Sequence, residues 1–283
     1  MTSTADRAAS VPGRGISAST TMAWDWDLGQ CIEAWVRVGL PAIGITRPQL
    51  EEYGRERGKR ELRDSGLAIA NYQGVDVYDV RDPARYPARQ ASALVYLDVA
   101  AELGADCVYV TTGPRGDLPW SEAARHIVEQ TTALLPELHA RDLRLAIEPV
   151  HPLRQDLTFL NTASDTIDLL HTIDDPLVGY VFDTWHLWWE RGIEDLARSS
   201  AHRVFNVQVS DHKPKTMRTM DRAVPGAGIA PLGPLLHALA DGGYAGWWDL
   251  EVISDDNAAL GYELALSTAV GALRDVWSAA NEA

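Results

Sequence analysis

Four oxygen-bearing side chains recur at intervals of about one strand–helix unit in the second half of the chain. They are Glu148, Asp183, Gln208 and Glu251, and each follows a short run of mainly apolar residues. Carboxylates gathered in a protein interior repel one another and resist ionisation unless a cation lies between them. Three carboxylates and one amide oxygen suit a hard divalent cation such as Mn²⁺ or Mg²⁺. The sequence therefore predicts a divalent metal site, if the fold brings these residues together.

Three histidines close to this set are candidates for contacting a substrate. His151 comes three residues after Glu148, where it either reaches a substrate or faces solvent in a loop. His186 comes three residues after the second carboxylate, and His212 lies just past the run that contains the amide. For His212, a supporting position behind the site and a solvent-facing position stay open.

Tryptophan is unusually frequent, with 10 residues against 3 phenylalanines. Trp185 belongs to a cluster that directly follows the second carboxylate, and Trp24 follows the first predicted strand. A flat apolar face above a polar site suits a sugar ring or an aromatic group attached to a sugar. We therefore place Trp185 among the candidate substrate-binding residues. Packing between barrel and helices is the preferred interpretation for Trp35, Trp247 and Trp277.

The order of the elements decides whether the candidate residues can meet. Eight short runs typical of strands alternate with longer stretches of helical periodicity. The predicted strands are Gly15–Ser19, Ala42–Thr46, Ala68–Tyr72, Cys107–Thr111, Arg144–Glu148, Gly179–Asp183, Val204–Ser210 and Trp247–Val252. The clearest predicted helices are Gln90–Leu103, Glu122–Ala140, Ala163–Thr172 and Tyr262–Ala279.

Eight strand–helix units in a chain of 283 residues predict an α/β fold, a single (β/α)₈ TIM barrel. The alternative, a doubly wound open sheet, usually has a glycine-rich phosphate turn after an early strand, and the sequence has none. Gly226 and Gly228 lie instead in a loop after the seventh strand. Functional residues of TIM barrels lie at the C-terminal ends of the strands. This fold would therefore gather the four oxygen donors in one mouth.

Composition excludes several kinds of partner. The 25 Lys and Arg against 40 Asp and Glu leave a net charge of −15, which argues against nucleic acid or an anionic membrane. No stretch of about 18 apolar residues occurs, so no membrane span is expected. Cys31 and Cys107 fit no metal or disulfide spacing and indicate a reducing, cytoplasmic setting. Residues 1–14 are interpreted as a flexible polar arm rather than a signal peptide, followed by one barrel domain over residues 15–283.

Five segments carry a resemblance to a known family. They are LAIEPVHP (145–152), FDTWHLWW (182–189), VQVSDHKP (207–214), DRAVPGAGIAPL (221–232) and GYAGWWDLEV (243–252). Together they resemble the sugar phosphate isomerase/epimerase superfamily, the xylose isomerase-like TIM barrels that include inosose dehydratases, ketose 3-epimerases and 3-dehydroshikimate dehydratases. The resemblance covers most of the chain and implies a small sugar, polyol or keto-glycoside substrate. Because such barrels often associate, a homo-oligomer is an open expectation.

The resemblance implies a role for each candidate residue. The three carboxylates match the metal ligands of the family, and Gln208 stands where many members have histidine. An oxygen donor at that place favours Mn²⁺, Mg²⁺ or Co²⁺ over Zn²⁺. His186 matches a D-x-x-H histidine and Arg222 matches an arginine of a D-R-x-x-P-G-x-G loop, both of which contact substrate in relatives. In epimerase relatives, the residues matching Glu148 and Glu251 exchange a proton from opposite faces of the substrate.

The predicted metal ligands also indicate a reaction type. A divalent cation that chelates a carbonyl and an adjacent hydroxyl lowers the cost of an enolate, so one carboxylate can take the α proton and another can return it. We therefore expect a metal-dependent sugar or polyol isomerase or epimerase. Loss of a β-substituent would instead give a lyase, and Gln208 and the tryptophans favour this alternative. Such a lyase would be an inosose or dehydroshikimate dehydratase, or a 3-keto-glycoside deglycosidase. A third alternative, a non-catalytic sugar-binding subunit, would not need paired carboxylates on a metal. A fourth, the apurinic-endonuclease branch of the same superfamily, is disfavoured by the net charge of −15.

Overall fold

The computed structural model describes residues 11–74 and 77–280, and its centre is a closed barrel of parallel strands. The barrel order is β1-β10-β7-β6-β5-β4-β3-β2. The strands are β1 (Gly15–Ser19), β2 (Ala42–Thr46), β3 (Ala68–Gln73), β4 (Val108–Val110), β5 (Leu145–Ile147), β6 (Val178–Asp183), β7 (Val204–Val209) and β10 (Trp247–Leu250). Each end lies within two residues of the predicted position, so the predicted TIM barrel is confirmed.

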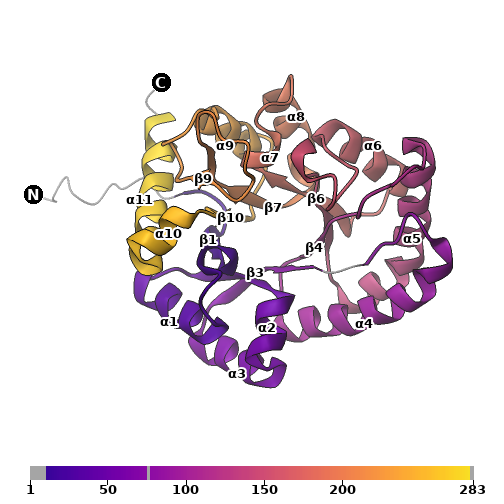
Figure 1. Ribbon diagram of the computed structural model, residues 1–283, viewed down its shortest axis with the longest axis horizontal. Coiled ribbons are helices and arrows are strands. Elements are labelled where there is room, and N and C mark those ends of the chain that lie inside the picture. Colours follow the sequence, from indigo (N-terminus) through magenta and orange to yellow (C-terminus); the bar gives the residue numbers. More distant parts are fainter. Residues whose placement is uncertain (1–10, 75–76, 281–283) are drawn as a thin grey trace, which may run out of the picture.

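The long helices surround the barrel on its outer side, and the short α7 (Thr184–Leu187) follows β6 at the barrel mouth (Figure 1). The other helices are α1 (Leu28–Val38), α2 (Arg47–Tyr53), α3 (Arg55–Ser65), α4 (Tyr86–Leu103), α5 (Trp120–Arg141), α6 (Ala163–Ile173), α8 (Ile193–Ser200), α9 (Leu232–Asp241), α10 (Asp255–Leu260) and α11 (Tyr262–Ala280). The four clearest helix predictions correspond to α4, α5, α6 and α11. Helix α4 begins a turn earlier than predicted because Pro87 fits a first helical turn, where no backbone donor is needed.

The interior of the barrel is layered, because alternate residues of each strand point toward the axis. The layer farthest from the mouth is apolar and holds Ala42, Ala70, Cys107, Phe205 and Trp247. Two residues after Trp247 comes Asp249, which accepts hydrogen bonds from Ser17 Oγ (2.6 Å) and Asn71 Nδ2 (2.8 Å). A Cβ on Gly44 would lie within 3.0 Å of both Asn71 and Asp249, so only glycine leaves space for this polar layer.

The next inward-facing positions form the barrel mouth. Glu148 and Glu251 lie just past β5 and β10, and their backbone amides still donate to the neighbouring strands (2.9 and 3.1 Å). Asp183 ends β6 and pairs with Gln208 on β7. The fold therefore puts all four predicted oxygen donors at one end of the barrel. Beside them, β8 (Asp211–His212) and β9 (Arg222–Ala223) form an antiparallel pair.

The predicted N-terminal arm lies largely outside the described residues, which begin at residue 11. The part that is described contacts the barrel: the Pro12 carbonyl accepts a hydrogen bond from the Trp248 indole (2.9 Å), and Arg14 pairs with Asp106 (2.7 Å). Among the helices of the described residues, none combines the length and apolar content that a membrane crossing needs.

Candidate metal and catalytic site

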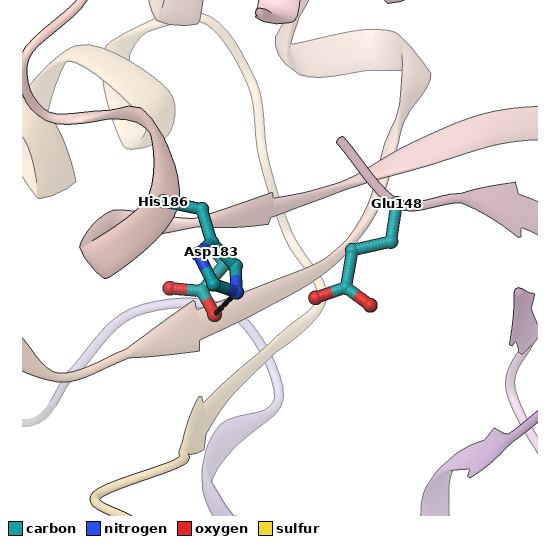
Figure 2. A group of neighbouring side chains, drawn as sticks. All are labelled: Glu148, Asp183 and His186. Carbon is teal, nitrogen blue, oxygen red and sulfur yellow. Dashed lines mark ion pairs between the residues drawn. The ribbon is translucent and has the colours of Figure 1, made fainter. Parts of the chain in front are cut away.

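Three buried side chains at the mouth form a compact group. Glu148, Asp183 and His186 each bring one potential ligand atom to within 4.8 Å of the others. Figure 2 shows the imidazole ring of His186 against Asp183, with the Glu148 carboxylate across from them. His186 Nε2 lies 3.5 Å from Asp183 Oδ2. The sequence assigns His186 to substrate, and the structure places its ring directly beside two of the predicted metal ligands.

Arg222 connects Glu251 to this group. Its Nη1 donates to Asp183 Oδ2 and to Glu251 Oε2, at 2.9 Å each. The other oxygen of Glu251 accepts a hydrogen bond from Thr21 Oγ1 (3.3 Å). A buried guanidinium needs partners of opposite charge, and here two carboxylates supply them. The structure therefore places Arg222 among the carboxylates, and it leaves the group with net negative charge when all three acids are ionised.

Gln208 presents an oxygen that no protein group satisfies. Its Nε2 donates to the Tyr109 hydroxyl (2.9 Å), which fixes the orientation of the amide. Its Oε1 is buried and has no hydrogen-bond donor among the described residues. A buried acceptor without a donor costs about 1–3 kcal/mol, and a cation at this oxygen would remove that cost. Three carboxylates, this free amide oxygen and the residual negative charge together fit a hard divalent cation.

The two glutamates differ in their electrostatic surroundings. Burial raises the pKa of Glu148 well above its usual value, and the charges of Glu251 and Asp183 raise it further. Among the described residues, no donor contacts the Glu148 carboxylate. Burial also raises the pKa of Glu251, but the charge of Arg222 opposes this effect. The Glu148 carboxylate therefore holds a proton more readily than the Glu251 carboxylate, as expected for an acid–base pair.

His186 is neutral and has a defined tautomer. Burial lowers its pKa to about 3. The backbone amide of His151 donates to its Nδ1 (3.3 Å), which assigns the ring proton to Nε2, 3.5 Å from Asp183 Oδ2. His186 can therefore donate one hydrogen bond at the mouth without bringing a charge there.

Trp185 packs behind the site. Its ring is fully buried, so it has no face open to the cavity at the mouth. His212 stacks on it at 4.9 Å between ring centroids, His151 meets it edge-on at 5.4 Å, and the Arg222 guanidinium lies 5.6 Å from its centre. The sequence makes all three aromatic rings candidates for substrate contact and leaves a supporting position open for His212. In the structure Trp185 packs against His186 and Arg222, and the rings of His151 and His212 pack against Trp185.

A cavity of about 270 Å³ opens above the carboxylates, and a second of about 290 Å³ adjoins it. The first is lined by Thr21, Trp24, Gln73, Glu148, Val150, Arg154, Leu157, His186, Thr219, Met220, Arg222, Glu251 and Ile253. Sequence reasoning missed Thr21, Gln73, Arg154 and Tyr109. The strand-end rule that found the carboxylates could have found Gln73, which is the last residue of β3.

Asp211 fixes the loop that carries Arg222. Its carboxylate accepts hydrogen bonds from the backbone amides of Gly226, Gly228 and Ala230, at 3.0 Å each. A Cβ on Gly228 would lie 2.3 Å from Asp211, so this close approach requires glycine. The glycines that sequence reasoning attributed to loop geometry thus shape the loop that brings the arginine into the mouth.

The buried Asp249 beneath the site leads to a pH-dependence prediction. Burial raises its pKa to about 6 from an unfolded value near 4, so it contributes stability below pH 4 that is lost as the pH rises through 6. Buried neutral His186 contributes stability that rises with pH, opposite to Asp249. We therefore compare wild type with Asp249→Asn, because the contribution of His186 is present in both proteins and cancels in the difference. In urea unfolding of metal-free protein, the stability of wild type relative to the variant should fall by about 1–2 kcal/mol between pH 5 and pH 7.5. A difference that stays level or grows over this range would contradict the raised pKa.

Two named relatives share sequence with the chain. An inosose dehydratase of Clostridium botulinum is 29% identical over 82% of this chain and 94% of its own length. An inosose isomerase of Bacillus licheniformis is also 29% identical, over 50% of this chain. That second match spans about half of the relative's length, 51%.

Solved structures show the same architecture. A protein from Sinorhizobium meliloti 1021 matches with a TM-score of 0.86 and 25% identity over 93% of this chain and 98% of its own. The IolI protein, in a crystal structure with a bound zinc atom, matches with a TM-score of 0.82 and 20% identity over the same shares. The sequence pattern that defines the xylose isomerase-like TIM barrel family matches residues 30–275 of this chain. The chain therefore belongs to the xylose isomerase-like TIM barrel family.

Proposed function

We propose that this protein is a divalent-metal-dependent isomerase or epimerase that moves a proton α to the carbonyl of a keto-sugar or keto-polyol. The observation that carries the proposal is the pair Glu148 and Glu251, which line one cavity next to Asp183 and the unsatisfied oxygen of Gln208. The names of the two relatives support an enzyme acting on a small polyol ketone.

The two glutamates would divide the proton transfer. The Glu148 carboxylate has no hydrogen-bond donor among the described residues and has a raised pKa, so in its ionised form it is a strong base at the cavity. Glu251 is held by Arg222 and Thr21 and would exchange the proton at the other side of the ring. Return to the opposite face gives an epimer, whereas return to the neighbouring carbon gives an aldose–ketose isomer.

The barrel mouth would also bind the metal and the substrate. Glu148, Asp183, Gln208 and Glu251 would bind a divalent cation, with Mn²⁺ as the proposed ion. When bound, such an ion stabilises negative charge on a carbonyl oxygen. Nε2–H of His186 and the guanidinium of Arg222 line the same cavity and would orient substrate oxygens.

A lyase is the second candidate. The inosose dehydratase match extends over most of both chains, and its name describes loss of water rather than isomerisation. The same first step, removal of the α proton, would then be followed by departure of a β-hydroxyl group or of the O-linked aglycone, which leaves with the electron pair of its C–O bond and takes up a proton. The nature of the product therefore distinguishes the two reactions.

The experiment is a screen of keto-sugars, inososes and 3-keto-glycosides in D₂O with Mn²⁺, followed by NMR. We expect one deuterium to enter the carbon α to the carbonyl, because the glutamates exchange their protons with solvent. A product of unchanged formula would identify an isomerase or epimerase, and loss of water or of an aglycone would identify the lyase.

Chelator-treated protein is the control, with Mn²⁺ added back to restore exchange. An isomerised or epimerised product without deuterium at the carbon that received the proton would exclude the proposed proton transfer. Elemental analysis that finds no stoichiometric divalent metal, together with no gain on adding Mn²⁺, would exclude the metal dependence.

A further inference from the structure

The mouth of the barrel has two lobes of different chemistry. The reaction lobe is the cavity of about 270 Å³ that contains Glu148, His186, Arg222 and Glu251. The side lobe, of about 290 Å³, is lined by Trp24, Thr46, Pro48, Gln73, Gly74, Tyr109, Val110, Thr111, Glu148 and Leu157. Trp24, Gln73, Glu148 and Leu157 line both lobes, so one opens into the other.

The two lobes lie over different strands. The reaction lobe takes Glu148 and Glu251 from the ends of β5 and β10, Arg222 from β9 and Arg154 from the segment after β5, with neutral His186 added from α7. The side lobe lies over the ends of β2, β3 and β4, where the residues are Thr46, Gln73 and Thr111. Glu148, at the junction, is the one carboxylate among the described residues that line the side lobe, and none of these residues is basic. A phosphate or carboxylate placed there would lose hydration without a basic side chain to pair with.

An aromatic surface marks the junction between the lobes. The Trp24 side chain is 48% exposed although it lines both cavities, whereas most large aromatic residues of the barrel are buried. Pro48, Val110 and Leu157 add apolar surface, and Thr46 and Thr111 add hydroxyl groups. Apolar faces with a few hydrogen-bonding groups are the usual lining of a site for an uncharged ring.

The reaction lobe differs from the side lobe in its charged side chains, although Val150, Met220 and Ile253 give it apolar surface as well. Its floor is formed by the carboxylates and Arg222, and its one further cation, Arg154, is paired with Asp156 (2.8 Å). A ring whose carbonyl reaches Glu148 would extend any large substituent through the junction past Trp24. The neighbouring space with matching chemistry is the side lobe.

We propose that the side lobe is a subsite for an uncharged second ring, so that the substrate is a keto-glycoside whose reacting ring occupies the reaction lobe. What happens to the reacting ring rests on the proposed function, whereas occupancy of the side lobe does not depend on turnover. If the chemistry is elimination, the group in the side lobe is the one that departs with the electron pair of its C–O bond and takes up a proton.

The test uses ligands that cannot react. Phenyl β-D-glucoside and methyl β-D-glucoside lack the carbonyl group needed for enolisation and differ only in the substituent. By isothermal titration of the Mn²⁺-supplemented protein, we expect the phenyl compound to bind at least about tenfold more tightly, because its ring leaves water for an apolar lobe. The 4-carboxyphenyl glucoside should lose this advantage, because its charge would lose hydration in a lobe whose described lining offers no basic side chain.

Variants connect the preference to the lobe. Trp24→Ala removes the exposed aromatic face, and Thr111→Trp fills the side lobe; each should reduce the phenyl preference to less than about threefold. Thr132→Trp, the same change at an exposed position of α5, should keep it. Trp24→Ala changes an exposed side chain, so it keeps the test decisive if Thr111→Trp fails to fold.

Equal affinity for the two glucosides, or a preference that survives both Trp24→Ala and Thr111→Trp, would overturn the subsite. Failure to bind either glucoside would overturn it as well. Absence of deuterium exchange with a retained phenyl preference would instead contradict the proposed function and leave the subsite supported.

Discussion

Replacing either paired glutamate by glutamine is expected to lower the rate of α-deuterium exchange by about 10²–10⁴-fold, the usual contribution of a general acid or base. Glu148→Gln removes the carboxylate that has no hydrogen-bond donor in the described part of the chain. Glu251→Gln removes the one held by Arg222 and Thr21. Because glutamine has nearly the same shape and keeps an oxygen donor, the loss would report proton transfer more than altered packing. The measurement is the rate of deuterium entry followed by NMR, at saturating substrate and Mn²⁺.

Glu33→Gln is the matched control, because Glu33 is an exposed residue of α1 with a 3.5 Å contact to Arg37. It should exchange deuterium at the wild-type rate. The two active-site variants would differ in one respect if the faces are distinct: with an epimerase, each should impair one direction of the reaction more than the other. Wild-type exchange in Glu148→Gln or in Glu251→Gln would contradict the assignment of that residue as a proton carrier.

The fold was predictable because its signals are local. Short β-branched runs alternate with amphipathic stretches, and the period of two within each strand decides which residues face the axis. Glu148 and Glu251 illustrate this: each follows an inward-facing residue by two, so each points into the barrel at the mouth. The TIM-barrel rule for functional positions then converts a list of strand ends into one site.

The supporting contacts were not predictable, because their partners are far apart in the sequence. Tyr109 orients Gln208 across 99 positions, and Asn71 donates to Asp249 across 178. No local pattern identifies such pairs, and a polar residue inside an apparent strand gives no sign of its partner. Trp185 shows the converse difficulty: a tryptophan next to a ligand is equally consistent with a substrate platform and with a buried support, and the structure shows the buried ring.

Charge at the mouth is best understood as a balance that is incomplete without a cation. Arg222 offsets one of three buried carboxylates, and neutral His186 offsets none. Burial raises the pKa of Glu148, and the negative charges of Glu251 and Asp183, which Arg222 offsets only in part, raise it further. These carboxylates would stabilise a bound divalent ion. Without the ion, their mutual repulsion means that they contribute less to the stability of the folded barrel.

The metal proposal leads to an expectation for Asp183, the most buried of the three carboxylates. Asp183→Asn should lower the affinity for Mn²⁺ by more than about 100-fold, since losing the partners of a ligand alone typically costs 10–100-fold. The asparagine oxygen can still accept the hydrogen bond that Trp185 N donates to Asp183 Oδ1 (2.7 Å), so the backbone turn into α7 should persist. Isothermal titration with Mn²⁺, supported by metal content after dialysis, measures the effect without reference to activity.

Asp195→Asn provides the control, because that side chain is 95% exposed on α8 and makes one weak contact to Arg198 (3.7 Å). It should bind Mn²⁺ as wild type does. Circular dichroism would verify that both variants are folded, which matters because Asp183→Asn also removes a charge that faces Arg222. If the folded Asp183→Asn protein bound Mn²⁺ with wild-type affinity, the ion would have to lie elsewhere in the mouth, and the paired glutamates would lose the electrostatic partner on which their proposed chemistry depends.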